Sequence, residues 1–390
     1  MGEFPPALAV SDAITKEGIV WRRHLHQRPE LAFEEHETSD FIARQLESFG
    51  LDVHRGLGET GVIGTLRRGT SARSIGIRAD MDALPITELT GMDHASQVPG
   101  VMHACGHDGH VAMALVAAKV CSQLSNIDGS VHFIFQPAEE GGGGAKRMIE
   151  QGLFNSFPCA RIFAIHNQPL LPFGTCVVRN GAMLAALAQF TIEIVGEGCH
   201  AARPHQGKDA IFAGCQIVTA LQSIISRNTD PLETGVVSVT KINAGNSFGV
   251  LPENCLICGT ARWFDEATGD LIEQRLRTIS VAIAEGFGCT ATVTVDRRNA
   301  ATINDAKSAE FVRALASKID GLTVEEHPPS TGSEDFSEML RLVPGCQIWL
   351  GGGRAVNDAG LHSPRYDFND ALIAKGALLW VSIVLESLSA

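Results

Sequence analysis

Apolar positions in the first half of the chain alternate between helical and strand-like spacing. The segment 35–49 carries apolar residues at helical spacing and is followed by Gly50, a common helix stop, so it predicts a helix. Near-continuous apolar runs are typical of strands covered on both faces of a sheet. The other elements predicted here are strands over 74–78, 131–136, 161–166 and 176–179 and a buried helix over 107–124. This alternation predicts an α/β fold with a mostly parallel sheet.

A different pattern begins near Ala188. It predicts, in order, a strand over 189–195, a helix over 209–226, strands over 235–242 and 254–264, a helix over 266–285 and a strand over 289–295. The order βαββαβ is the ferredoxin-like arrangement, and a unit of about 110 residues is a normal domain size.

The α/β pattern then resumes, with a helix over 306–319, a strand over 346–350 and a long closing helix over 369–388. We therefore expect one α/β domain, built from residues 1–184 and 300–390. An inserted ferredoxin-like α+β domain over 185–299 interrupts it.

Composition limits the classes of protein to consider. The 390 residues exceed a typical single core, and 45% hydrophobic against 19% charged residues favours a large folded core. A net charge of −13 argues against a nucleic-acid partner. No stretch approaches the roughly 18 apolar residues of a membrane span, and Met1–Pro6 does not resemble a secretory leader. Ten scattered cysteines then favour reduced thiols and a cytoplasmic location.

Two short motifs carry the candidate chemistry. Met102-His-Ala-Cys-Gly-His-Asp-Gly-His110 places Cys105 and His107 in a glycine-bearing turn, and Gln136-Pro-Ala-Glu-Glu140 ends an apolar run with two carboxylates. Cys, His and Glu are the usual protein ligands for zinc-type cations. A second carboxylate beside a ligating one can act as the base for a metal-activated water. The pattern predicts a metallohydrolase.

The candidate ligands share a position relative to the predicted strands. Glu139 and Glu140 follow the strand 131–136, and His166 ends the strand 161–166. Cys105 and His107 open a helix, and His362 lies beyond the strand 346–350 and its glycines. In α/β sheets, ligands bind at strand carboxyl ends beside helix N-termini, so we expect these groups to converge.

Taken singly, each signal is weak. A lone Cys-x-His is more often structural, and adjacent glutamates are commonly a solvated pair, although here they follow an apolar strand. Gly141–Gly144 lacks the Gly-Lys-Ser/Thr ending of a phosphate loop, which disfavours a nucleotide site. No Gly-x-Ser-x-Gly elbow supports serine catalysis.

Taken together, the motifs resemble the M20 metallopeptidase superfamily over nearly the whole chain. The closest resemblance is to the amidohydrolase branch, which contains hippurate hydrolases, bacterial N-acyl-amino-acid amidohydrolases and plant auxin-conjugate hydrolases. The motifs are His24-Leu-His-Gln-Arg-Pro-Glu-Leu31, Gly76-Ile-Arg-Ala-Asp-Met-Asp-Ala-Leu-Pro85, the two quoted above, Gly332-Ser-Glu-Asp-Phe336 and Leu361-His-Ser-Pro364.

The resemblance implies a site for two divalent metal ions (zinc, manganese, cobalt or nickel). Cys105 would bridge them as a thiolate. His107 and His166 would bind one ion, and Glu140 and His362 the other.

It also implies roles for neighbouring carboxylates. Glu139 would be the general base, and Asp80 would orient a ligand imidazole. The wider superfamily has a His-x-Asp motif where this chain reads Arg78-Ala-Asp80, so His107 would replace that ligand. The departure favours the amidohydrolase branch.

The inserted domain would act as a lid and dimerisation domain. In Gly196-Glu-Gly-Cys-His-Ala-Ala-Arg-Pro204, His200 would reach a neighbouring subunit's site and stabilise the oxyanion. Asn246 and Arg262 would bind the substrate's carboxylate. This role for His200 implies a homodimer or homotetramer.

The predicted function is hydrolysis of N-acyl-L-amino acids, small-molecule substrates, to a carboxylic acid and a free amino acid. Two alternatives remain open. One is a dipeptidase or carboxypeptidase of the same fold, and the other is a non-catalytic, metal-stabilised binding protein.

Overall fold

The computed structural model describes residues 10–354 and 359–389, so Met1–Pro6 lies outside the described residues. The chain forms two compact units. Unit 1 comprises the residues up to Met183, Ile303–Pro328 and the chain from Asp335 on; unit 2 comprises Leu184–Thr302 and Pro329–Glu334. The chain leaves unit 1 along β7 (Gly181–Leu184) and returns along β14 (Thr302–Asn304), and these two strands pair with each other.

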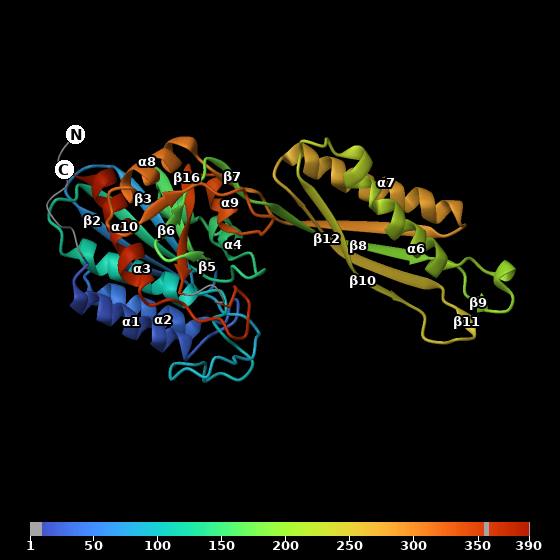
Figure 1. The fold of residues 1–390 in the computed structure, drawn as a ribbon, viewed down its shortest axis with the longest axis horizontal. Helices are drawn as coiled ribbons and strands as arrows, with labels where there is room; N and C mark the ends of the chain where they lie inside the picture. The colour runs from blue at the N-terminus through green and yellow to red at the C-terminus, as the bar shows by residue number, and fades with distance from the viewer. Residues whose placement is uncertain (1–9, 355–358, 390) are drawn as a thin grey trace. The chain divides into compact units, whose positions relative to one another are not determined.

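Unit 1 is built on an eight-stranded sheet of order β1-β2-β4-β3-β5-β16-β6-β15 (Figure 1). Its strands are β1 (Asp52–Leu57), β2 (Gly61–Arg68), β3 (Ser74–Asp80), β4 (Gly129–Gln136), β5 (Arg161–Pro172), β6 (Thr175–Val177), β15 (Thr323–Glu325) and β16 (Gly345–Gly353). The central pairs β4–β3, β3–β5 and β5–β16 are parallel, as is β6–β15. The predicted mostly parallel sheet is confirmed. The antiparallel β1–β2 hairpin, which extends it beyond β4, was not predicted.

Helices cover both faces of this sheet. One face packs against α1 (Asp12–His26), α2 (His36–Ser48), α3 (His107–Ser122), α8 (Ala306–Ala316) and α10 (Leu372–Leu388). The other packs against α4 (Gly144–Glu150), α5 (Leu153–Ser156) and α9 (Phe336–Leu340). Along β5, Phe163 and Ile165 enter the first core, and Ile162 and Ala164 enter the second. The apolar runs are therefore continuous because successive side chains enter two different cores.

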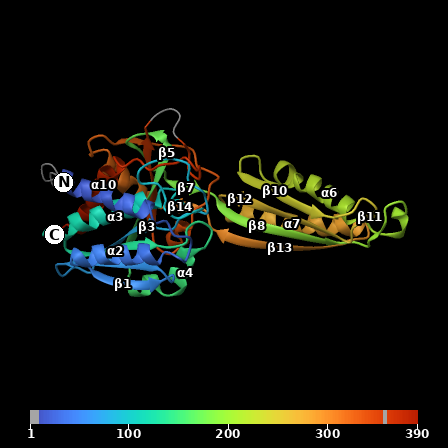
Figure 2. The same ribbon diagram turned by 90° about the horizontal axis from the view of Figure 1, so that it is seen from below.

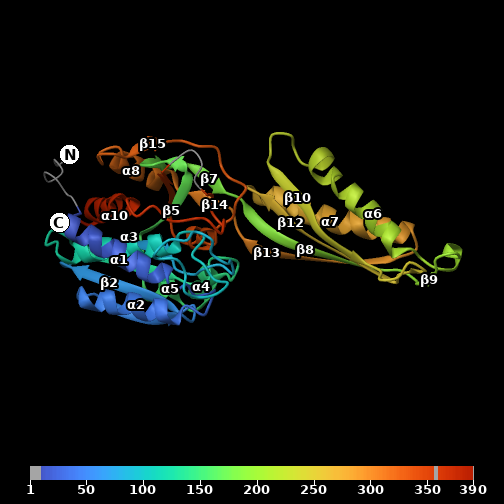
Figure 3. The same ribbon diagram turned by 60° about the horizontal axis from the view of Figure 1, so that its bottom comes forward.

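Unit 2 contains a four-stranded antiparallel sheet of order β10-β12-β8-β13 (Figure 2). Its strands are β8 (Ala186–Val195), β10 (Gly235–Ala244), β12 (Asn254–Trp263) and β13 (Thr290–Asn299). Helices α6 (Ala210–Leu221) and α7 (Glu266–Gly286) pack on the same face (Figure 3). Alternate residues of β8 are buried, so this unit has its own core beneath the two helices.

Short elements complete unit 2. Strands β9 (Cys199–His200) and β11 (Val250–Leu251) pair with each other, and Pro204–Gln206 forms a 3-10 turn. The helix predicted over 209–226 is interrupted, because α6 ends at Leu221 and a separate π-helical turn spans Ile224–Asn228.

Among the described residues, no helix combines the length and apolar character needed to cross a membrane.

Candidate metal centre

The carboxyl ends of β3 and β4 lie level with each other and with the middle of β5. Asp80, the last residue of β3, pairs with Gln136, the last residue of β4, and Arg78 pairs with Ala164 of β5. Glu139 and Glu140 lie three and four residues after the end of β4. His166 lies inside β5, two residues after Ala164, because the strand continues to Pro172 and does not end at His166 as predicted; α3 begins at His107. The parallel register therefore delivers candidate ligands to one edge of the sheet.

The turn that carries Cys105 requires a glycine. Gly106 has φ of +87°, and a Cβ there would lie 2.4 Å from both Asn167 Nδ2 and Tyr366 Oη. Asn167 Nδ2 donates a hydrogen bond of 2.7 Å to the Cys105 carbonyl, and Tyr366 Oη donates one of 2.7 Å to Asn167 Oδ1. These contacts fix the turn against β5 and hold the thiol in place.

All five predicted ligands lie in two groups, and within each group the ligand atoms lie within 4.8 Å of one another. One group contains Cys105, Glu140 and His362, and another contains Asp80, His107, His110 and His166. Cys105 Sγ lies 3.4 Å from His166 Nε2, which links the two groups. Glu139 groups with His107 and Glu140.

The two buried histidines of α3 differ in how their ring nitrogens are bonded. His110 uses both: Nδ1 contacts Asp80 Oδ1 at 2.5 Å, and Nε2 accepts from the Asn167 backbone N–H at 2.9 Å. His107 uses only Nδ1, which lies 3.1 Å from Asp82 Oδ1. Its buried Nε2 has no hydrogen-bond partner among the described residues and lies 3.8 Å from Asp80 and 4.0 Å from Glu140. His107 is thus available to a cation, whereas His110 is a supporting residue.

Asp80 is predicted to orient a ligand imidazole, but in the structure it contacts His110, which is outside the predicted ligand set. Its hydrogen bonds go to His110 and to Arg78 Nη1, the latter at 2.8 Å, and Asp82 is the carboxylate that orients His107. Arg78 is itself buried and donates to Gln136 Oε1 at 2.7 Å and to Asp335 Oδ1 at 3.1 Å. Arg78 therefore anchors Asp80 through its own buried contacts.

The charges of the site favour a bound cation. Burial, together with Glu140 and Glu139, raises the pKa of the Cys105 thiol well above its usual range. Burial lowers the pKa of His107, but Asp80 and Asp82 outweigh it and raise the value to about 10. Burial raises the pKa of Asp80, but His107, His110 and Arg78 outweigh it and hold the value well below the usual range. The donor set thus carries excess negative potential that a divalent ion would neutralise.

The Glu139–Glu140 segment is held through its backbone. The Glu140 N–H donates to Asp82 Oδ2 at 2.9 Å, so Asp82 supports both His107 and Glu140. A Cβ at Gly144 would lie 1.7 Å from the Pro137 carbonyl oxygen, so a glycine is required where the chain folds back. The glycines that follow Glu140 therefore serve this turn.

His362 completes the group from the segment after β16. Its backbone has a positive φ of 64°, uncommon for a residue other than glycine, and its N–H donates to the Ala104 carbonyl at 2.8 Å. Its Nε2 lies 3.2 Å from Glu140 Oε1, and the side chain is 53% exposed. His362 therefore lies on the solvent side of the group, an orientation that a bound ion could stabilise.

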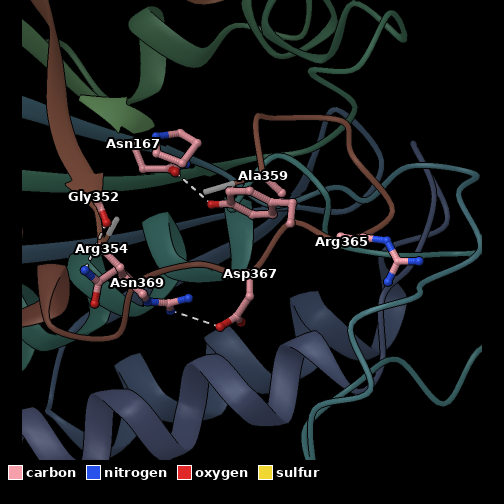
Figure 4. Close-up of a pocket in the computed structure, with 9 residues that line it drawn as sticks. Asn167, Gly352, Arg354, Ala359, Arg365, Asp367 and Asn369 are labelled. Carbon is pink, nitrogen blue, oxygen red and sulfur yellow. Dashed lines mark hydrogen bonds and ion pairs between the residues drawn. The ribbon is translucent and has the colours of Figure 1, made fainter. Parts of the chain in front are cut away.

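Beside the turn lies a small polar pocket of about 60 Å³, lined by Asn167, Tyr366, Asp367 and Arg354 among others (Figure 4). Arg354 forms an ion pair of 2.9 Å with Asp367, while the labelled Arg365 side chain points away from that pair. The pocket has room for only a few water molecules. It is too small for an acyl chain, and it borders the residues that hold the Cys105 turn.

Three predicted residues lie in unit 2. His200 is exposed on β9, and its Nδ1 accepts from the Ala202 N–H at 3.0 Å. Asn246 is exposed between β10 and β11. Arg262 is half-buried on β12 and donates to the Thr331 carbonyl at 3.0 Å.

These three residues lie at opposite ends of the unit 2 sheet. Arg262 pairs with Leu187, at the start of β8. Val195, at the other end of β8, pairs with Asn254 and leads into β9, which carries His200. Asn246 lies two residues after Ala244, the last residue of β10, and Ala244 pairs with Cys255 at that same end. The strand from Asn254 to Arg262 spans roughly 26 Å, so Arg262 lies at the far end of β12 from the strand ends that lead to His200 and Asn246.

Sequence reasoning missed several supporting residues. Asp82 and His110 lie inside the quoted motifs, so their spacing from Asp80 and His107 was an available signal. Asn167 and Tyr366 had no such signal, because their roles depend on the close approach of the Cys105 turn to β5.

Comparison with known proteins agrees with this geometry. Residues 76–386 match the model of "Peptidase family M20/M25/M40". The chain is 38% identical to the hippurate hydrolase of Campylobacter jejuni over 94% of its length and 95% of that protein. It is also 38% identical to the IAA-amino acid hydrolase ILR1-like 2 of Arabidopsis thaliana, over 94% of this chain and 84% of that protein. A dinuclear metal-binding peptidase of the M20 family from Bacillus subtilis superimposes with a TM-score of 0.85 at 32% identity, covering 97% and 99% of the two chains.

Proposed function

Since the chain belongs to the M20/M25/M40 peptidase family, we propose that it is a metal-dependent amidohydrolase that cleaves N-acyl-L-amino acids to a carboxylic acid and a free amino acid. The observation that carries the proposal is the donor cluster at the strand ends. There His107 Nε2, which has no hydrogen-bond partner within the described parts of the chain, faces carboxylates, and a further glutamate, Glu139, lies beside Glu140. The two hydrolases with matching sequences, whose names specify amino-acid conjugates, support this substrate class.

The donor set fits two divalent ions. Cys105 would contribute to both as a bridging thiolate, because its Sγ approaches His166 and also groups with Glu140 and His362. His107 and His166 would hold one ion, and Glu140 and His362 the other. Zinc, manganese, cobalt and nickel all accept thiolate, imidazole and carboxylate ligands. When bound, such ions would lower the pKa of water and polarise the scissile carbonyl.

The remaining chemistry belongs to the protein's own side chains. Glu139 would take the proton of the attacking water and return it to the leaving amine. Asp82 holds His107, and Asp80 with Arg78 fixes His110 behind the ligands, so the ligand rings need little rearrangement.

We further propose that unit 2 is a ferredoxin-like lid and dimerisation domain. His200 would stabilise the oxyanion, and Asn246 and Arg262 would bind the amino acid's carboxylate. Because Arg262 lies at the opposite end of the sheet from His200 and Asn246, they would reach one substrate only from two different chains. The separation therefore supports a homodimer, or a homotetramer built from it. All ten cysteines are free thiols, which supports a reducing cytoplasmic location.

The proposal is tested by incubating metal-reconstituted enzyme with N-acetyl-, N-benzoyl-, indoleacetyl- and long-chain N-acyl-amino acids, together with dipeptides. Amino acid release is quantified beside a chelated control. Metal-dependent release from one acyl class supports the proposal and names the acyl group. Release only from the dipeptides would favour a dipeptidase, and metal binding without any release would favour a binding protein.

A further inference from the structure

A buried carboxylate outside the ligand set contacts the segment that carries the proposed base. Glu35 precedes α2, and its exposed fraction is 0%. Its Oε1 accepts the Ala138 backbone N–H at 2.9 Å, and its Oε2 accepts the Thr60 hydroxyl at 2.6 Å. A single side chain thus connects the segment before α2, the β1–β2 turn and the segment after β4.

The residue that Glu35 holds has an unusual backbone conformation. Ala138 has a φ of +54°, in the left-handed region that alanine rarely adopts. Its carbonyl accepts the Gly144 N–H at 3.1 Å, and a Cβ at Gly142 would lie 2.6 Å from the Ala138 Cβ. The surrounding turn closes tightly around this residue, and the bond from Glu35 fixes its N–H.

A second buried carboxylate acts two residues further along. Asp82 accepts the Glu140 N–H at 2.9 Å, as Glu35 accepts the Ala138 N–H. The backbone N–H groups of the residues on either side of Glu139 are therefore each bound to a carboxylate from a different part of unit 1. Such a pair restricts rotation of the backbone at Glu139, and the direction of its side chain follows from that backbone.

We propose that Glu35 is a positioning residue for catalysis: by holding the Ala138 peptide in its left-handed conformation, it aims Glu139 at the reacting water and Glu140 at the metal. The proposal rests on the proposed function of Glu139 and Glu140. Glu35 itself touches neither substrate nor metal. Its effect should appear in kcat and in the metal's coordination geometry, because substrate binding does not depend on it directly.

The test uses four variants of the full chain. Glu35→Ala removes both hydrogen bonds, whereas Glu35→Gln keeps an oxygen for the Ala138 N–H and an amide for Thr60. Thr60→Val leaves Glu35 in place but removes the hydroxyl that orients it. Glu34→Ala is the matched control, because Glu34 is the adjacent glutamate and is exposed. For each variant we would measure kcat, KM, the melting temperature and the absorption spectrum of the Co²⁺-loaded protein.

We expect kcat to fall at least about tenfold in Glu35→Ala with KM within about twofold, since small misplacement of a catalytic group is costly. Thr60→Val should also lower kcat, but by a smaller factor than Glu35→Ala. Glu35→Gln and Glu34→Ala should match the wild type. In the Co²⁺ spectrum, Glu35→Ala should shift the ligand-field bands because Glu140 is displaced. Glu35→Gln and Glu34→Ala should leave these bands unchanged.

The outcomes separate this proposal from the function on which it rests. A wild-type enzyme that binds Co²⁺ but cleaves no acyl amino acid contradicts the proposed function, and the spectrum alone then decides the role of Glu35. If Glu35→Ala lowers the melting temperature but leaves kcat and the spectrum unchanged, Glu35 only stabilises the fold and the proposal is wrong. If Glu35→Ala does not fold, kcat and the Co²⁺ spectrum of Thr60→Val decide whether Glu35 is a positioning residue. Wild-type values of both would show that the proposal is wrong.

Discussion

The candidate residues of unit 1 and those of unit 2 differ in how firmly each is held. In unit 1, Asp80, His107 and Cys105 are buried, and each is fixed by contacts from a neighbouring strand or turn. In unit 2, His200 and Asn246 are exposed on short loop-like segments. The candidate metal centre is therefore preorganised within one chain, whereas the residues proposed for the oxyanion and carboxylate contacts belong to a separate unit.

This difference separates two parts of the proposed reaction. Activation of water needs ligands at fixed distances, which a buried network on parallel strand ends can supply. Recognition of a substrate that must enter and leave suits exposed residues on a separate unit. Substitutions of the candidate residues in unit 1 should therefore abolish turnover or metal binding. Activity lost through substitutions in unit 2 should be restored by a second chain whose unit 2 is intact.

The largest expected effect is that of Glu139→Gln. Removing the proposed base while keeping the side chain's shape should lower kcat by about 10³-fold or more, with both metal ions still bound. Turnover and metal content per chain would be measured together, with the exposed Glu150→Gln as the control. Activity close to that of the wild type would show that Glu139 is not the base.

A somewhat smaller loss is expected for His200→Ala. Removing one oxyanion donor typically costs about 10²-fold in kcat. If His200 acts on a neighbouring chain's site, mixing inactive His200→Ala and Glu139→Gln proteins should restore activity, because one site of each mixed dimer then has both groups intact.

The mixing experiment needs subunit exchange, which native mass spectrometry of differently tagged chains can verify. Verified mixed dimers without recovered activity would mean that His200 serves the site of its own chain. Two differently tagged preparations of Glu139→Gln provide the control that should stay inactive.

Within unit 1, Asp82→Asn should weaken metal binding without removing a ligand. Asp82 supports His107 and the Glu140 N–H, and loss of such a supporting carboxylate typically lowers metal affinity by about 10- to 100-fold. Competition with a chelating dye would measure the change against the exposed control Asp93→Asn. Unchanged affinity would mean that the backbone contact between His107 and the Asp82 carbonyl is sufficient.

The smallest effect on turnover, but a distinct effect on stability, is expected for Glu35→Gln. Burial raises the pKa of Glu35 from 4.5 to about 7, so the folded state holds a proton between these pH values that the unfolded state has lost. The contribution of Glu35 to stability therefore falls as pH rises from about 4.5 to about 7 and is constant above that.

Glutamine does not titrate, so the variant should gain stability relative to the wild type across this pH window, by up to about 3 kcal/mol. Urea unfolding at pH 5 and pH 8 would measure the difference in unfolding free energy. An equal difference at both pH values would contradict the raised pKa of Glu35.

The sequence by itself predicted an α/β fold with a mostly parallel sheet and the set of polar residues that meet beside its strand ends. Apolar periodicity located the central strands and α3, because side chains covered on both faces leave a continuous signal. Parallel strands end at one edge, so the order of elements alone indicated that Cys105, His107, Glu139, Glu140 and His166 would meet. The motif resemblance to the M20 family is confirmed by the comparisons.

Only the tertiary structure decided which neighbouring groups support those ligands. That Asp82 rather than Asp80 orients His107, and that Glu35 reaches the Ala138 N–H, depends on contacts between segments 25 and 103 residues apart. The roughly 26 Å of strand that separates Arg262 from Asn254, at the end of the sheet that leads to His200, likewise follows from sheet register. A pattern along the chain records which residues are polar or apolar, but hydrogen-bond partners depend on distances of a few tenths of an ångström that packing alone sets.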